Sequence, residues 1–311
     1  MSRKRLSRTG VNETIAQLFP RFLTAKSAQG VSAKTLTTYR THFQCIGKHI
    51  DLSIPIRELA RSDIDSLIVS MRQSGLAHNS VSSYVRVFRT FLHWCNEEGY
   101  TALEFPNMRD RETVKEVYTD EELARLLEKP ERDSDFAEYR NWVIINFLMN
   151  CGCRASTVRN IRISDVSLSD RQIIFRHTKT GKIQSIPLCS SMVSILKEYM
   201  TVRGGTAQDY LFPNQFGEML TESAFASAIR RYNTQRGVKK TSLHLFRHTF
   251  ARKYLIDCGG DAFMLQRLLG HSTLDMTKHY CAIYDSDIAG NYDAHSPLSQ
   301  LNRTTKRIIR R

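Results

Sequence analysis

His244-Leu245-Phe246-Arg247-His248 begins the most informative stretch of the sequence, residues 244–280. It continues through Leu268-Leu269-Gly270-His271 to Thr277-Lys278-His279-Tyr280. Apolar residues at helical spacing separate these groups, which predicts helices that carry the polar side chains. A tyrosine hydroxyl has a pKa of about 10 and is a poor nucleophile without a base beside it and cations around its target. Histidine titrates near neutral pH, and the planar arginine fork can grip two phosphate oxygens. The set therefore suits attack by a tyrosine on a phosphodiester.

Metal binding is the rival interpretation of the two neighbouring histidines. His244 and His248 are four residues apart, as zinc ligands on one helix can be. Leu245 stands where the HExxH motif has its glutamate, so we expect no metal. A lone histidine or tyrosine in a helix is usually structural, and only the order of the whole set favours catalysis.

Two cations upstream extend the candidate site. Arg154 follows Cys151-Gly152-Cys153 at a break between helical segments, where a side chain can point into a cleft. Lys179 lies in the expected turn of a β-hairpin between strands at 172–176 and 183–188. Each of them, taken alone, is more typical of an ordinary surface cation.

The composition indicates the class of binding partner and the cellular compartment. The 311 residues allow about two domains, and 45 lysines and arginines against 31 acids give a net charge of +14. Such an excess indicates a polyanion, with nucleic acid ahead of a membrane surface, because no basic amphipathic helix stands apart and no run could span a bilayer. The seven cysteines form no CxxC pair, which is typical of free thiols in a reducing compartment. We expect a soluble, cytoplasmic, nucleoid-associated protein without a membrane partner.

The N-terminal half reads as four amphipathic helices without strands. Ser32 is the expected N-cap of the second helix, and Pro20 predicts a kink or break in the first. Basic side chains on the second and fourth helices are candidates for DNA phosphate contact, with a merely solvated face as the equal alternative: Lys34, Arg40, Arg86 and Arg89.

The second half begins at Thr119, which forms a capping-box pattern with Glu122. A helix over 136–150 is apolar around most of its circumference, so we expect it to be buried. The fold class is therefore mainly α, a four-helix domain plus an α-rich domain with a small antiparallel β-hairpin. The expected layout is a basic disordered N-terminus (1–11), a helical core DNA-binding domain (12–100), a linker (101–117), a catalytic domain (118–290) and a basic C-terminal tail (291–311).

The ordered motifs closely resemble the tyrosine recombinase (phage integrase) family. The resemblance rests on HxxRH at His244–His248, on LLGH ending at His271, and on Tyr280 nine residues later. Gly152-Cys153-Arg154 resembles the family's Gly-Leu-Arg segment, and Thr178–Gly181 resembles its Thr-Lys-Thr-Gly segment. The likeness covers about residues 12–290, in a two-domain Xer/Cre-like layout without an arm-binding domain. Residues 12–100 match the SAM-like core-binding domain only in pattern and position.

The resemblance implies a role for each motif residue. Tyr280 would attack the scissile phosphate, leaving a 3′-phosphotyrosyl link and a free 5′-hydroxyl. Arg154 and Arg247 would hold the non-bridging oxygens with help from His271. Lys179 would protonate the leaving 5′ oxygen, and His244 would assist proton transfer at the tyrosine. No cofactor and no Mg²⁺ would be needed.

The family also implies partners and a biological task. Double-stranded DNA with specific sites, a homo-tetramer, a Holliday junction and an accessory DNA-bending protein belong to that expectation. We expect integration or excision of a mobile element; Xer-like dimer resolution, type IB topoisomerase-like relaxation and a catalytically weak DNA-binding regulator are the alternatives.

The chain differs from the family pattern at Thr157, and it continues beyond Tyr280. Thr157 stands where the family commonly has an acid that orients its catalytic groups, so either the Thr157 hydroxyl or a carboxylate such as Asp165 would have to substitute. Beyond Tyr280 the tail would dock on a neighbouring protomer or pack in cis.

Overall fold

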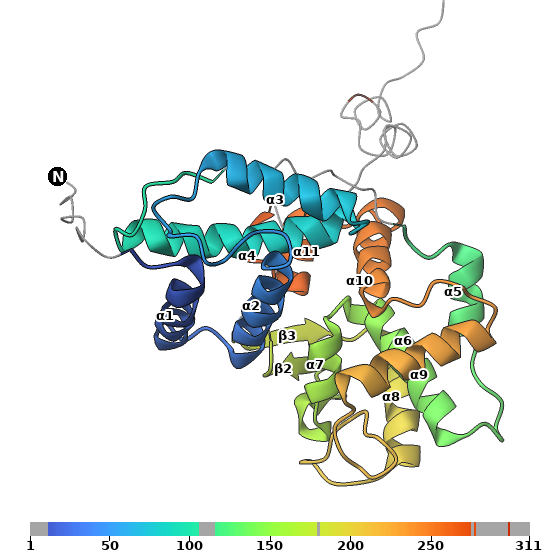
Figure 1. Cartoon of the computed structure of the whole chain (residues 1–311). Coiled ribbons are helices and arrows are strands. Elements are labelled where there is room, and N and C mark those ends of the chain that lie inside the picture. The colour runs from blue at the N-terminus through green and yellow to red at the C-terminus, as the bar shows by residue number, and fades with distance from the viewer. Residues whose placement is uncertain (1–11, 106–115, 179–180, 275–276, 278–297, 299–311) are drawn as a thin grey trace, which may run out of the picture. The chain divides into compact units, whose positions relative to one another are not determined.

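The computed structural model describes residues 12–105, 116–178, 181–274, 277 and 298. The chain divides into two compact units, residues 1–112 and 113–311 (Figure 1). Each unit has a hydrophobic core of its own. The prediction of a mainly α fold with a small antiparallel sheet is confirmed.

The described residues of the first unit, 12–105, form four helices, α1 (Ile15–Ala28), α2 (Ala33–Ile46), α3 (Arg61–Gln73) and α4 (His78–Glu97). Ser32 caps α2 as predicted, because its side chain accepts a hydrogen bond from the Thr35 amide. Phenyl rings fill the core where α1, α2 and α4 meet, and Phe19 stacks on Phe43 with ring centroids 3.5 Å apart.

Of the kink or break expected at Pro20, the break does not occur. The helix runs through it from Ile15 to Ala28. Pro20 removes one helix hydrogen bond at a cost of about 3 kcal/mol. Phe19 and Phe22 on either side are buried, each contributing about 1.5–3 kcal/mol, and this burial holds the helix together.

The second unit contains most of the secondary structure. Its helices are α5 (Asp120–Leu127), α6 (Phe136–Cys151), α7 (Ala155–Asn160), α8 (Ser190–Arg203), α9 (Glu222–Gln235), α10 (Leu243–Arg252) and α11 (Ala262–Leu269). A 3-10 turn, Ile163–Asp165, follows α7, and a π-helical segment, Lys253–Asp257, extends α10. The capping box of Thr119 and Glu122 forms at the start of α5 as predicted.

The central helix of this unit is α6, which contacts α5, α8, α9 and α10 (Figure 1). Its buried residues lie on all sides, as the continuous apolar pattern predicted. Because α6 packs against α10 and ends at Cys151, three residues before Arg154, it fixes the two segments that carry the candidate arginines.

The sheet has three antiparallel strands in the order β1 (Val166–Ser167), β2 (Gln172–Phe175) and β3 (Gln184–Pro187). Ile173 pairs with Ile186 and Phe175 with Gln184. Ile173, Phe175 and Ile186 are buried, so one face of the hairpin closes the core. Lys179 lies between these strands in the sequence but outside the described residues.

No helix in the described part of the chain has both the length and the apolar character needed to cross a bilayer.

Candidate active site

Arg247 is the most deeply buried charged residue of the candidate site. It lies on α10 between Phe246 and Phe250, and only 1% of it is exposed. Its guanidinium donates to the carbonyl oxygens of Gly152 at 3.0 Å and Leu269 at 2.9 Å. Nη2 also lies 2.6 Å from Nε2 of His271. These three partners are uncharged at neutral pH, so they fix the guanidinium in place without cancelling its charge.

His271 follows the left-handed Gly270 that ends α11, and it too is buried. Burial, and then the positive charges of Arg247 and Arg154, lower the pKa of His271 to about 4. Arginine can only donate, so Nε2 is the acceptor and the ring proton of neutral His271 lies on Nδ1. Nδ1 is 2.8 Å from the Thr277 hydroxyl, which accepts that proton's hydrogen bond.

Arg154 approaches Arg247 and His271 from the turn between α6 and α7. Gly152 makes this turn with a φ of 56°, a left-handed value that favours glycine. A Cβ there would lie 2.2 Å from the Phe250 ring, so α10 packs directly on the turn. The turn carries Arg154 to the N-cap of α7 and close enough to His271 for its charge to act on the imidazole.

A small pocket unites these residues. Arg154, Arg247 and Gly270 line it together with Thr178, the last described residue before Lys179. The remaining lining residues are Cys153, Thr157, Phe175, Gln184, Leu268 and Leu269. Two arginines beside a neutral imidazole make a site for an anion with several oxygens, such as a phosphodiester.

Two of the predicted residues cannot be placed, because Lys179 and Tyr280 lie outside the described residues. Thr178 and Gly181 flank Lys179, and Thr277 is buried three residues before Tyr280. The sequence thus brings both residues next to described parts of the second unit.

His244 is placed differently from the arginines. It is exposed on the first turn of α10, and it is absent from the described lining of the pocket. Its ring meets that of His248 edge to face, with centroids 5.4 Å apart.

Thr157, not Asp165, lines the pocket. The buried Asp165 carboxylate accepts from Arg176 Nε at 2.7 Å and from the Arg162 amide at 2.9 Å. These bonds close the 3-10 turn and tie it to the end of β2. Of the two candidates for replacing the family's acid, only the Thr157 side chain is at the pocket.

Three residues of this site had no role predicted from the sequence. Cys153 forms part of the pocket wall, and burial raises the pKa of its thiol well above the usual range, so it stays neutral. Gln184 and Thr277 hold neighbouring groups by hydrogen bonds. Gln184, the first residue of β3, belongs to no motif, and Thr277 stands in the stretch that ends at Tyr280 without a role of its own.

The four candidate DNA-contact residues lie on the first unit. Lys34 and Arg40 belong to α2, and Arg86 and Arg89 belong to α4, which packs against α2. All four side chains are exposed. They therefore remain candidates for contact with a polyanion.

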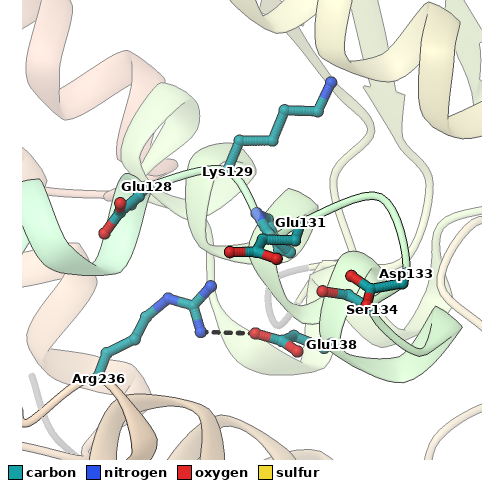
Figure 2. A pocket seen from close by; sticks show the side chains of 8 residues that line it. Glu128, Lys129, Glu131, Asp133, Ser134, Glu138 and Arg236 are labelled. Atoms are coloured by element: carbon teal, nitrogen blue, oxygen red, sulfur yellow. Dashed lines mark hydrogen bonds and ion pairs between the residues drawn. The ribbon is translucent and has the colours of Figure 1, made fainter.

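A larger pocket, of about 450 Å³, lies elsewhere in the second unit (Figure 2). Its acidic lining residues are Glu128, Glu131, Asp133 and Glu138, and its cations are Lys129 and Arg236. Arg236 and Glu138 pair at 2.9 Å. The net negative lining repels phosphate, so size alone does not identify the site for a phosphodiester.

Comparison with known proteins identifies the region that holds this site. The model of the phage integrase family matches residues 116–287. A tyrosine recombinase of Pseudothermotoga lettingae is 28% identical over 260 residues, which cover 81% of this chain and 86% of the relative. Tyrosine recombinase XerC of Xanthomonas campestris pv. campestris is 24% identical over 306 residues, 96% of this chain and 93% of the relative.

Solved structures share the fold. The Tn1549 transposon integrase in complex with a circular intermediate DNA superposes with a TM-score of 0.74 at 19% identity, over 90% of this chain and 99% of that one. A lambda integrase tetramer bound to a Holliday junction gives a TM-score of 0.70 at 18% identity, over 90% and 81% of the two chains.

Proposed function

The chain belongs to the phage integrase family, and on that premise we propose that it recombines specific DNA sites through a tyrosine nucleophile. It is an enzyme of the tyrosine recombinase class. The observation that carries the proposal is that Arg154 and Arg247 line one pocket while His271 is bonded to Arg247.

The proposed reaction is a transesterification. Tyr280 attacks the scissile phosphorus and forms a 3′-phosphotyrosyl bond, while the bond to the 5′ oxygen breaks. Lys179 supplies the proton that the leaving 5′ oxygen takes up, and His244 assists removal of the proton from the tyrosine. A 5′-hydroxyl of the partner strand then reverses the step, so the bond energy is kept and no ATP is needed.

Arg154 and Arg247 would stabilise the charge that develops on the non-bridging oxygens. Arg247 suits this role because the Gly152 and Leu269 carbonyls already hold its position, so little reorganisation is needed. With these cations supplying the stabilisation, we expect cleavage to persist in EDTA.

The state of His271 implies a change on substrate binding. In the free protein its Nε2 accepts from Arg247 and therefore has no proton to donate to a phosphate oxygen. A bound phosphate raises the imidazole pKa by its negative charge. We propose that His271 takes up a proton as the scissile phosphate enters, and then donates from Nε2.

The proposed substrate is double-stranded DNA. Exposed cations on α2 and α4 would contact its phosphates, with the helical domain (12–100) and the catalytic domain (118–290) binding the same duplex. We further propose a homo-tetramer on DNA, assisted by a DNA-bending protein, with the tail (291–311) as a contact between subunits. The lambda integrase structure, a tetramer on a Holliday junction, supports this arrangement by likeness of fold.

For the biological task we propose integration or excision of a mobile element. The likeness in fold to the Tn1549 transposon integrase supports this proposal. The likeness to XerC over nearly the whole chain favours a second candidate, resolution of replicon dimers.

A strand-exchange assay tests the proposal. The protein is incubated with two labelled duplexes, one carrying the joined ends of its element and one the empty target. We expect Holliday junctions and recombinant products, both lost in Arg247→Ala. Relaxation of supercoiled DNA without exchange would indicate a topoisomerase, and binding without any product would indicate a regulator.

A further inference from the structure

Gln184 joins two parts of the pocket that are far apart in the sequence. It is the first residue of β3 and pairs with Phe175 at the end of β2. Its side-chain amide Nε2 donates to the Leu268 carbonyl at 2.8 Å and also contacts the Arg267 carbonyl. One side chain thus connects the β2–β3 hairpin to the end of α11.

The two acceptors belong to the last turn of α11, where the Gly270 amide also donates to the Arg267 carbonyl at 3.1 Å. Gly270 follows at once, and a Cβ there would lie 2.9 Å from Gln184 Oε1, so the amide rests directly on the turn. From another side, Arg247 donates to the next carbonyl, that of Leu269. Gln184 of β3 and Arg247 of α10 therefore hold consecutive carbonyl groups, those of Arg267, Leu268 and Leu269, shortly before His271.

We propose that Gln184 is a positioning residue, which fixes the hairpin that carries Lys179 in its sequence against the turn that carries His271. The inference rests on the proposed function, because it assumes that Lys179 is the general acid. Its consequence is that loss of the Gln184 amide impairs protonation of the leaving group more than it impairs phosphate binding.

The chemistry of the leaving group separates this role from a merely structural one. A 5′ oxygen needs a proton to leave, whereas a 5′ sulfur leaves as a stable thiolate without one. A defect in proton donation therefore shrinks when sulfur replaces the bridging oxygen, but a defect in phosphate binding or in folding does not.

The experiment measures single-turnover cleavage of nicked DNA with a bridging 5′ oxygen or a bridging 5′ sulfur. Gln184→Leu is compared with Lys179→Ala and with the control Ser185→Ala, whose exposed hydroxyl bonds only across the strand pair to Gln172 in the described contacts. We expect Gln184→Leu to lower cleavage of the oxygen substrate about tenfold, as for loss of a partly buried hydrogen bond. With sulfur, the loss should largely disappear for both Gln184→Leu and Lys179→Ala, and Ser185→Ala should match the wild type throughout.

An equal loss on both substrates for Gln184→Leu, with Lys179→Ala rescued, would overturn the role of Gln184 and leave the proposed function standing. Failure of sulfur to rescue Lys179→Ala would remove the general acid from the proposed function, and the role of Gln184 with it. If Gln184→Leu does not fold, Gln184→Asn, one methylene too short to reach the carbonyls, serves in the same comparison.

Discussion

Arg247 and His271 share a hydrogen bond between guanidinium Nη2 and imidazole Nε2, 2.6 Å apart inside the second unit. Because the arginine can only donate, this contact fixes the imidazole as neutral and as an acceptor. The same contact explains why His271 resists protonation and why a phosphate would change its state.

The pH dependence of stability follows from His271. An unfolded histidine binds its proton near pH 6.5, whereas folded His271 does so only near pH 4. Between these values the unfolded state holds more protons, so we predict that the free energy of unfolding falls as pH drops from about 6.5 to about 4, by at most about 1.4 kcal/mol per pH unit from this residue.

Urea unfolding across this pH range measures the effect. His271→Gln is the matched control, since glutamine does not titrate and other groups contribute equally to both proteins. The wild type should lose more stability than the variant on acidification, and parallel curves would contradict the assigned state of His271.

Thr277 holds the other nitrogen of the ring, and the predicted effect of changing it is on catalysis. Thr277→Val keeps the shape but leaves the buried Nδ1–H of His271 without its acceptor, at about 1–3 kcal/mol. We predict that cleavage slows about tenfold. Thr277→Ser retains the hydroxyl and should cleave near the wild-type rate; equal losses in the two variants would count against the hydrogen bond.

Gly152 should tolerate alanine poorly. Gly152→Ala combines a left-handed φ with a contact of 2.2 Å between the new Cβ and Phe250. Gly237→Ala has a similar φ of 67° and nothing within 4 Å, so it isolates the cost of conformation, about 1 kcal/mol. Thermal unfolding should show a much larger drop in Tm for Gly152→Ala, and equal drops would mean that α10 moves away freely.

Salt dependence tests the candidate DNA-contact residues of the first unit. If Arg86 and Arg89 each contact a phosphate, alanine at either position lowers the slope of log affinity against log salt by about one. Arg61→Ala is the control, since Arg61 pairs with Asp65 at 3.3 Å. Unchanged slopes for Arg86→Ala and Arg89→Ala would assign them to a solvated face.

The sequence predicted the features that depend on local pattern. The buried α6, the capping box at Thr119 and the two main strands follow from periodicity and short-range chemistry. The sequence did not predict β1, because a strand of two residues has no detectable periodicity. The break expected at Pro20 does not occur, because the packing of Phe19 and Phe22 that holds α1 together is a tertiary effect.

The candidate site likewise contains residues that sequence motifs predict and residues that only the folded chain brings together. Motif order identified Arg154, Arg247 and His271, which the structure brings together. The hydrogen bonds of Gln184 and Thr277 join segments whose proximity depends on the folded chain, so no sequence pattern marked them. Asp165 was a plausible acid by position, but its bonds to Arg162 and Arg176 emerge only in the folded unit.

Covalent trapping tests whether Tyr280 becomes covalently joined to DNA. Nicked DNA spanning a junction of the host element is incubated with the protein in EDTA and denatured in SDS. We expect a protein–DNA adduct at the 3′ end of the cut strand, present in the wild type and lost in Tyr280→Phe. DNA bound with no adduct, or an adduct that persists in Tyr280→Phe, would contradict it.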